Sequence, residues 1–347
     1  MPPSLTSRTL GSIWGVCVGD ALGGPVQFMD PGAFEPITGL EYVKPFQQPA
    51  GSYSDDGSMT LALAQSIIDS QGQYNHALSI QYFVDWFTTG RFSTIDRAWD
   101  VGISTRSALQ SWRKRGTDDL QRVQEVINQK LDVEQSSGNG SLMRIAPIGL
   151  ALWRDPGEAR RVAREQSRVT HPVLGCLEAC EVYTLLVCGV LSGKNKEHLC
   201  TIINEYNFTH STLAQRLSNY KTPSDWQAKS APEIRSSGWV VDTLEVALWG
   251  FFKFDSWAAG ALAVANLGGD SDTAAAVYGG LAGAFYGFES IPTEWVDGMQ
   301  NKGLIEEVAG GLAEVVSPGG VFELNWLGTS TSTLGEAWVG ICDTWRM

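Results

Sequence analysis

The stretch Thr9-Leu-Gly-Ser-Ile-Trp-Gly-Val-Cys-Val-Gly-Asp-Ala-Leu22 predicts a helix that packs closely against another helix. Its glycines, Gly11, Gly15 and Gly19, recur four residues apart, so they share one face of a helix. Glycine has no Cβ to hold a neighbouring backbone away, and such a face therefore permits a close helix–helix contact. This segment favours a fold built from packed helices.

Helical periodicity dominates the rest of the chain. Met59, Leu63 and Ile67 recur four residues apart, and Gly72 supplies a stop. Further helices are predicted over 174–191, 240–252, 257–267 and 273–288. The best strand signals are short, at 41–43 and 321–324, and 23–53 is expected to be a long loop over a site. The fold class is therefore all-α, as a single compact domain of orthogonally packed helices spanning 1–347.

The composition is acidic and sparsely charged. The 347 residues contain 25 Lys and Arg against 38 Asp and Glu, which gives a net charge of −13. Charged residues make up 18%, below the roughly 25% of an average chain. A nucleic-acid interface needs a basic face, so this class of partner is excluded. An anionic ligand would have to be held by backbone N–H groups or by metal ions.

Nothing in the sequence indicates export or a membrane. The chain begins without an apolar signal segment, and the most apolar stretch, 274–288, is shorter than the ~20 residues that span a bilayer. The six cysteines form no C-x-x-C pair and are expected to be free thiols in a reducing compartment. We expect a cytoplasmic monomer.

Two acidic clusters carry the clearest chemical signal. Ser54-Asp55-Asp56 and Asp270-Ser-Asp272-Thr273 each stand directly before an apolar helix. Helix capping is one interpretation, because Ser, Asp and Thr accept backbone N–H bonds at a helix start. Capping, however, needs one such residue per helix, and crowded carboxylates repel one another unless cations or protons intervene.

The candidate ligands are all oxygen atoms, which favours Mg²⁺, Mn²⁺ or Ca²⁺ over zinc. Four carboxylates with two hydroxyl groups suffice for two octahedral ions completed by water. The predicted metal ligands are Ser54, Asp55, Asp56, Asp270, Asp272 and Thr273. No G-x-S-x-G elbow for a serine triad and no Walker loop occurs in the chain.

Three further features could bind a nucleotide. The glycine-rich stretch Gly138-Asn-Gly-Ser-Leu-Met-Arg144 could offer backbone N–H groups to a phosphate, or it could be a plain turn. His171 could donate to a phosphate or ribose, or could be structural. Trp239 could stack on a nucleobase, although core packing is the usual role of tryptophan.

Taken together, these elements resemble the ADP-ribosylglycohydrolase family, the family of the dinitrogenase reductase activating glycohydrolase. The resemblance runs from Gly15 to about Trp295, and six motifs occur in the family's order. They are Gly19-Asp20-Ala-Leu-Gly23, Ser54-Asp55-Asp56, Gly138 to Arg144, Thr170-His171, Gly238 to Trp249 and Gly269-Asp270-Ser-Asp272-Thr273. The resemblance implies an all-α fold with a dinuclear Mg²⁺ or Mn²⁺ centre.

The resemblance also assigns roles to residues. The six predicted metal ligands match the family's ligands, and the glycine-rich loop matches a loop that holds substrate phosphates. The implied substrate-binding residues are Gly138, Asn139, Gly140, Ser141, His171, Gly238 and Trp239. Ser54 stands where Thr is commoner, Gly57 where many members have Thr, and Ser136 where some carry an Asp suspected of activating water. The identity of the base is therefore open.

The implied function is hydrolysis of an ADP-ribosyl linkage at the anomeric carbon of the distal ribose. Water activated by the ions would attack that carbon, with Asp55, Asp56 or Asp272 as the catalytic carboxylates. One alternative is a phosphoesterase that acts on a phosphorylated or cyclic-phosphate ADP-ribose derivative. Another is an inactive ADP-ribose-binding or structural member. The acceptor cannot be read from the sequence.

Overall fold

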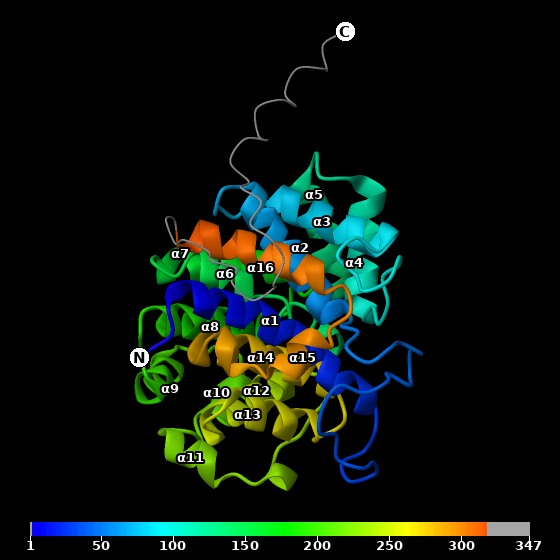
Figure 1. The fold of residues 1–347 in the computed structure, drawn as a ribbon. Helices are drawn as coiled ribbons and strands as arrows, with labels where there is room; N and C mark the ends of the chain where they lie inside the picture. The colour runs from blue at the N-terminus through cyan, green and yellow to red at the C-terminus, as the bar shows by residue number, and fades with distance from the viewer. Residues whose placement is uncertain (1, 318–347) are drawn as a thin grey trace.

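Two antiparallel helices, α1 (Leu5–Gly23) and α14 (Ser271–Tyr286), lie against each other at the centre of the molecule (Figure 1). The structure, a computed structural model, describes residues 2–317. A Cβ added at Gly15 would overlap the carbonyl oxygen of Gly279, and one at Gly279 would overlap the carbonyl oxygen of Gly15. The glycine face read from the sequence is therefore the contact face, and the two backbones touch along it.

The other helices pack around this pair. On one side lie α2 (Asp55–Asp69), α3 (His76–Thr89) and α16 (Lys302–Val316); on the other lie α12 (Val240–Lys253) and α13 (Trp257–Ala265). A third group consists of α6 (Ala146–Ala151), α7 (Pro156–Arg168) and α8 (Leu174–Leu191). The peripheral helices are α4 (Ile103–Arg115), α5 (Leu120–Leu131), α9 (Lys196–Glu205), α10 (Ser211–Leu217), α11 (Pro223–Ala228) and α15 (Thr293–Asp297).

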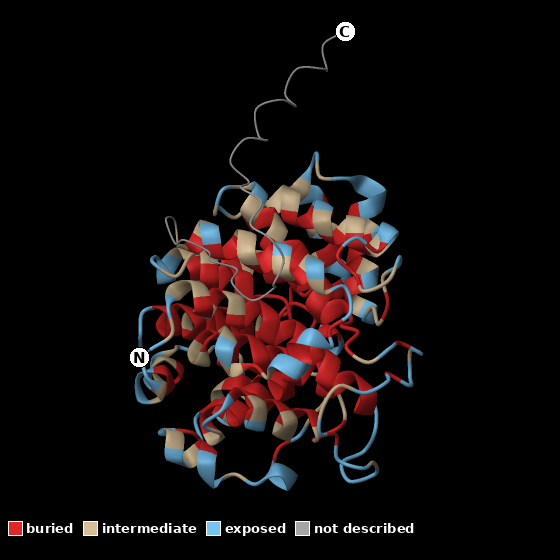
Figure 2. Cartoon of the chain, in the orientation of Figure 1, coloured by how far each residue is buried: buried red, intermediate tan, exposed pale blue. Residues whose placement is uncertain are grey.

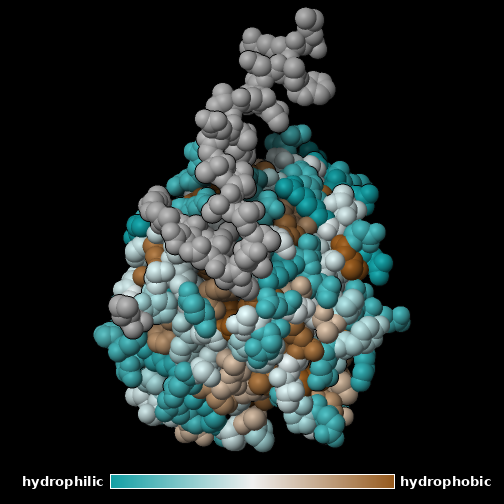
Figure 3. Space-filling view, in the orientation of Figure 1, coloured by the Kyte–Doolittle hydropathy of each residue, from teal (hydrophilic) through white to brown (hydrophobic). Residues whose placement is uncertain are grey.

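Burial follows this arrangement. Residues of α1, α8, α12 and α14 are mostly buried, whereas exposed residues gather on the outer helices and loops (Figure 2). On the face seen in Figure 3, hydrophobic residues form small patches among hydrophilic ones outside the grey region. Helix α8 is the one described helix long and apolar enough to cross a membrane, with 18 residues of mean hydropathy 1.7, and 89% of it is buried inside the protein.

The all-α fold class is confirmed: no strand occurs among residues 2–317. The predicted helix over 174–191 is present with the same bounds, and those over 240–252, 257–267 and 273–288 are present with ends shifted by one or two residues. The strand signal at 41–43 is wrong, because Val43 makes only an isolated bridge to Gln48 and the chain turns back between them. The signal at 321–324 lies outside the described residues.

Candidate active site

The site begins with Asp20, near the end of α1. Its Oδ2 atom accepts hydrogen bonds from the backbone N–H groups of Ser54 at 2.8 Å and Gly57 at 2.9 Å. Asp20 thereby caps α2 from a different helix, and neither Ser54 nor Asp270 caps its own helix through its side chain. The capping interpretation therefore does not account for the two acidic clusters.

Three buried carboxylates converge where α1, α2 and α14 meet. One carboxylate oxygen from each of Asp20, Asp56 and Asp272 lies within 4.8 Å of the other two. The Oδ1 atoms of Asp56 and Asp272 are buried without a hydrogen-bond partner among the described residues. Buried acceptor atoms are seldom left unsatisfied, and oxygen-only clusters suit hard divalent cations. The residues present therefore fit a divalent metal ion.

Hydroxyl groups surround these carboxylates. The Ser54 hydroxyl donates to Asp56 Oδ2 at 3.1 Å and lies 3.3 Å from Asp55 Oδ1, and the Thr273 hydroxyl lies 3.4 Å from Asp56 Oδ2. Gly57, where the family resemblance implies Thr in many members, lies beside Tyr53, and a Cβ added at Gly57 would clash with the Tyr53 ring. Tyr53 thus fills the space that a threonine side chain would need.

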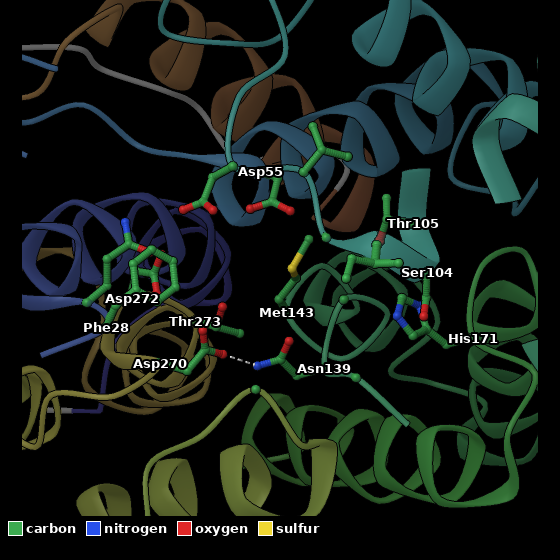
Figure 4. Close-up of a pocket in the computed structure, with 18 of the residues that line it drawn as sticks. Phe28, Asp55, Ser104, Thr105, Asn139, Met143, His171, Asp270, Asp272 and Thr273 are labelled. Carbon is green, nitrogen blue, oxygen red and sulfur yellow. Dashed lines mark hydrogen bonds between the residues drawn. The ribbon is translucent and has the colours of Figure 1, made fainter. Parts of the chain in front are cut away.

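A cavity of about 540 Å³ opens beside the carboxylates. Asp55, Asp270 and Asp272 lie at one end of it, and His171 and Thr105 lie at the other, with Asn139 and Met143 between (Figure 4). The lining residues are Gln27, Phe28, Asp55, Asp100, Val101, Gly102, Ile103, Ser104, Thr105, Gln135, Gly138, Asn139, Gly140, Met143, His171, Gly238, Asp270, Asp272 and Thr273. The cavity therefore joins the two acidic clusters to the glycine-rich loop.

Asn139 does more than line the cavity. Its Nδ2 atom donates to the Thr243 hydroxyl at 2.9 Å and to Asp270 Oδ2. The amide therefore holds one of the predicted metal ligands in place, and its N–H groups are taken by the protein. The backbone N–H of Asn139 donates to the Gly238 carbonyl at 3.2 Å, so a substrate hydroxyl could reach Asn139 only through the side-chain oxygen, which accepts.

The glycine-rich loop turns at the far end of the cavity. The Asn139 carbonyl accepts from the N–H groups of Leu142 at 2.8 Å and Met143 at 3.1 Å. As at a helix N-terminus, the N–H groups of Gly140 and Ser141 precede the first hydrogen-bonded turn and remain for another acceptor. The ring of His171 lies against Gly140, where an added Cβ would clash with its Cε1 atom.

Burial raises the pKa of the carboxylates, and their mutual repulsion raises most of them further. The pKa values of Asp55, Asp56 and Asp272 are raised well above the usual range, and that of Asp270 is also raised by burial. Burial raises the pKa of Asp20 to about 7. Without a cation, these carboxyl groups tend to hold protons at neutral pH.

A pH dependence of stability follows for the metal-free protein. Because the pKa of Asp20 rises from about 3.9 in an unfolded chain to about 7 in the folded one, the folded state binds more protons. The stabilisation is complete below about pH 4 and is lost as the pH rises through about 7. With EDTA, we expect the melting temperature to fall by several degrees from pH 5.5 to 8, since one pKa unit corresponds to about 1.4 kcal/mol.

Excess Mg²⁺ should remove most of that fall, because the ion replaces the protons. Scanning fluorimetry at both pH values, with EDTA and with Mg²⁺, measures the effect. A metal-free protein that is more stable at pH 8 than at pH 5.5 would contradict the proton-binding behaviour of this cluster.

Not every predicted site residue reaches the cavity. The Ser141 hydroxyl accepts from Ser167 at 2.8 Å inside the protein, and Ser141 does not line the cavity. Trp239 is half-buried, pairs its backbone with Gly138 and is also absent from the lining residues. Its contact with adenine stays a prediction. Ser54 and Asp56, which hydrogen-bond to each other, are also absent from the lining residues.

The sequence missed three residues of this site. Asp20 was quoted only as part of the Gly19–Gly23 motif and was given no role, although it completes the carboxylate cluster. Asp100 lines the cavity with a positive φ of 55° and a buried Oδ2 atom that has no partner. Phe28 stands at the carboxylate end, where its N–H donates to the Gly269 carbonyl at 2.6 Å. Phe28 lies in the segment 23–53 that was predicted to cover a site, although it was not singled out, and for Asp100 no local pattern gave a signal.

Comparisons with known proteins identify the family and the fold. The family model described as ADP-ribosylglycohydrolase matches residues 1–320. A relative from Pseudomonas putida, named an ADP-ribosylarginine hydrolase, is 32% identical over 303 residues, which cover 85% of this chain and 75% of the relative. A relative from Rhodospirillum rubrum, named ADP-ribosyl-[dinitrogen reductase] glycohydrolase, is 27% identical, with 86% and 92% covered. A solved structure titled ADP-ribosylglycohydrolase-related protein complex superposes with a TM-score of 0.75 at 30% identity, covering 90% of this chain and 99% of that one.

Proposed function

This chain belongs to the ADP-ribosylglycohydrolase family, a family of hydrolases, and from this premise we propose that it cleaves an ADP-ribosyl linkage at the anomeric carbon of the distal ribose. One observation carries the proposal. A single cavity has buried carboxylates with unpartnered oxygens at one end and the unused backbone N–H group of Gly140, beside His171, at the other. This arrangement suits a ligand with a hydroxyl-rich sugar at one end and an anionic diphosphate at the other.

The carboxylate end would hold two divalent cations, Mg²⁺ or Mn²⁺. The proposed ligands are Asp20 together with Ser54, Asp55, Asp56, Asp270, Asp272 and Thr273. When bound, such ions supply Lewis acidity that orients ribose hydroxyls and lowers the pKa of water. Asn139 keeps Asp270 in place through its amide, and Asp20 keeps the first turn of α2 in place through its hydrogen bonds.

The diphosphate end would hold its anion without a basic side chain. No Lys or Arg is among the residues that line the cavity. The backbone N–H group of Gly140 and the ring of His171, which both line the cavity, are the proposed donors. A chain of net charge −13 can bind a nucleotide in this way because backbone dipoles, rather than side-chain charges, would face the phosphates.

Asp100 is the proposed group that steers or deprotonates the attacking water, beside Asp55 and Asp272. Its Oδ2 atom is buried with no partner, and burial raises its pKa to about 6. A carboxylate whose pKa lies near the working pH can both accept and return a proton. Asp100 therefore takes the place left open by Ser136, which is buried outside the cavity lining.

Product analysis on a panel of substrates tests the proposal. Purified protein with Mg²⁺ or Mn²⁺ should release free ADP-ribose from an ADP-ribosyl-arginine or ADP-ribosyl-serine peptide, and EDTA should stop the release. ADP-ribose carrying a phosphate on the distal ribose is assayed in parallel in ¹⁸O-labelled water. If ¹⁸O appears in the inorganic phosphate and neither peptide releases ADP-ribose, the protein is a phosphoesterase instead. Binding of ADP-ribose without turnover of any substrate would identify an inactive member.

A further inference from the structure

Arg144, at the end of the glycine-rich loop, is completely buried. Its Nη2 atom donates to the Thr170 hydroxyl at 2.9 Å, its Nη1 atom lies 3.6 Å from the Met59 sulfur, and its guanidinium lies 4.5 Å from the centre of the Phe83 ring. No carboxylate of residues 2–317 forms an ion pair with it. A buried charge without a counter-charge is costly, so its placement needs a reason.

The Thr170 hydroxyl lies between Arg144 and His171 and contacts both side chains. The Thr170 Oγ atom lies 2.8 Å from His171 Nδ1 as well as 2.9 Å from Arg144 Nη2. Arginine can only donate, so the Thr170 oxygen accepts from Arg144. The single proton of the threonine hydroxyl then has one acceptor in reach, which is His171 Nδ1.

His171 faces the cavity with its other nitrogen. Nε2 lies 3.5 Å from the position of a Cβ at Gly138 and 3.3 Å from that of one at Gly140, so it borders the glycine-rich loop. Burial, and then the positive charge of Arg144, lower the pKa of His171 to about 3. The ring is therefore neutral at pH 7, and its one proton is on either Nδ1 or Nε2.

We propose that Arg144 and Thr170 are positioning residues that keep the His171 proton on Nε2, so that the ring donates a hydrogen bond to an anionic group in the cavity. The opposite tautomer would turn a lone pair toward the anion and repel it. The guanidinium also polarises the Thr170 hydroxyl toward Nδ1, which strengthens Nε2–H as a donor. The identity of the anion as a diphosphate rests on the proposed function. The tautomer rests instead on the contacts of Thr170 with Arg144 and His171.

Long-range ¹H–¹⁵N spectra of the metal-free protein test the tautomer directly. The chain has four histidines, and His171→Gln identifies the relevant signals by their loss. We expect an unprotonated Nδ1 and a protonated Nε2 at pH 7. A protonated Nδ1 in the wild-type spectrum would overturn the inference, whether or not any variant folds.

Two substitutions then test the role of Thr170. Thr170→Ser keeps the hydroxyl and should leave the His171 Nδ1 signal and the affinity for ADP-ribose unchanged. Thr170→Val has the same shape without the donor, and should move the Nδ1 signal and weaken ADP-ribose binding about tenfold, as expected for one lost hydrogen bond to a charged group. A Val variant with wild-type spectrum and affinity would overturn the proposal.

Ligand titration separates this inference from the proposed function. ADP-ribose, or inorganic pyrophosphate in its place, should shift the Nε2–H signal of His171. If pyrophosphate shifts that signal and ADP-ribose does not bind, the positioning role stands and the proposed function fails. If ADP-ribose binds and leaves the signal unmoved, the donor role of His171 is wrong while the proposed function stands.

Discussion

Asp56→Asn is expected to abolish hydrolysis and divalent-cation binding together while leaving the fold intact. Asp56 is fully buried beside Asp20 and Asp272, and its Oδ1 atom has no hydrogen-bond partner in the described part of the chain. Asparagine has nearly the same shape as aspartic acid, but its amide offers one neutral oxygen where the carboxylate offers a charged one. Loss of a neighbouring residue that only supports a metal ligand costs about 10 to 100-fold in affinity or activity. Loss of a ligand itself should cost more than about 100-fold.

The same substitution should raise the stability of the metal-free protein above pH 7. Burial, and then repulsion from Asp20 and Asp272, raise the pKa of Asp56 in the folded protein, and asparagine has neither a charge to bury nor a proton to retain. Calorimetry with Mg²⁺ and Mn²⁺, turnover and melting temperature in EDTA are the three readouts. Asp118→Asn, at an exposed position, is the matched control and should change none of them. A variant that keeps both metal affinity and activity would show that Asp56 is not a ligand.

Gly15→Val is expected to prevent folding, or to lower the free energy of unfolding by more than about 4 kcal/mol, which marks an exceptional substitution. A Cβ at Gly15 would overlap the carbonyl group of Gly279, which belongs to the backbone of α14 and cannot move aside as a side chain can. The two helices would have to separate. Since α1 carries Asp20 and α14 carries Asp272, the carboxylate cluster would open as well.

Gly310→Ala is the matched control for Gly15→Val. Gly310 also lies within a helix, α16, but a Cβ added there meets no atom of residues 2–317 within 4 Å. Alanine should therefore stabilise the protein by about 0.5 to 1 kcal/mol, as it does at an unhindered helical position. Urea unfolding followed by circular dichroism measures both variants. Equal effects of the two substitutions would show that the close contact of α1 with α14 does not hold the fold.

The predicted helices show which features of a fold can be inferred from a local sequence pattern. The four-residue spacing of Gly11, Gly15 and Gly19 predicted both a helix and its contact face, because periodicity along a helix is a property of neighbouring residues. The sequence could not name the partner of that face. The matching small residues lie on α14, near the other end of the chain, and only packing brings the two helices together.

The acidic clusters were visible for a similar reason, since each is a short run before an apolar helix. That the two clusters lie together in space was inferred from their chemistry, and the structure places Asp56 and Asp272 in one carboxylate cluster. No role was assigned to Asp20 from the sequence because it is a single acidic residue inside a helix. None was assigned to Asp100 because that residue lies in a loop without a recognisable motif. Each acquires its place only when other segments pack beside it.

The sequence alone therefore determined the all-α class, the glycine face and the two acidic runs, whereas anion binding by the Gly138–Arg144 stretch stays a prediction. Only the tertiary structure decided that Asp20 caps α2, that the amide of Asn139 is taken by Asp270, and that the hydroxyl of Ser141 points into the protein. The physical reason is the range of the interactions. Propensity and periodicity act within a few residues, whereas a side chain's hydrogen-bond partners and its distance from water depend on segments that the chain brings together only by folding.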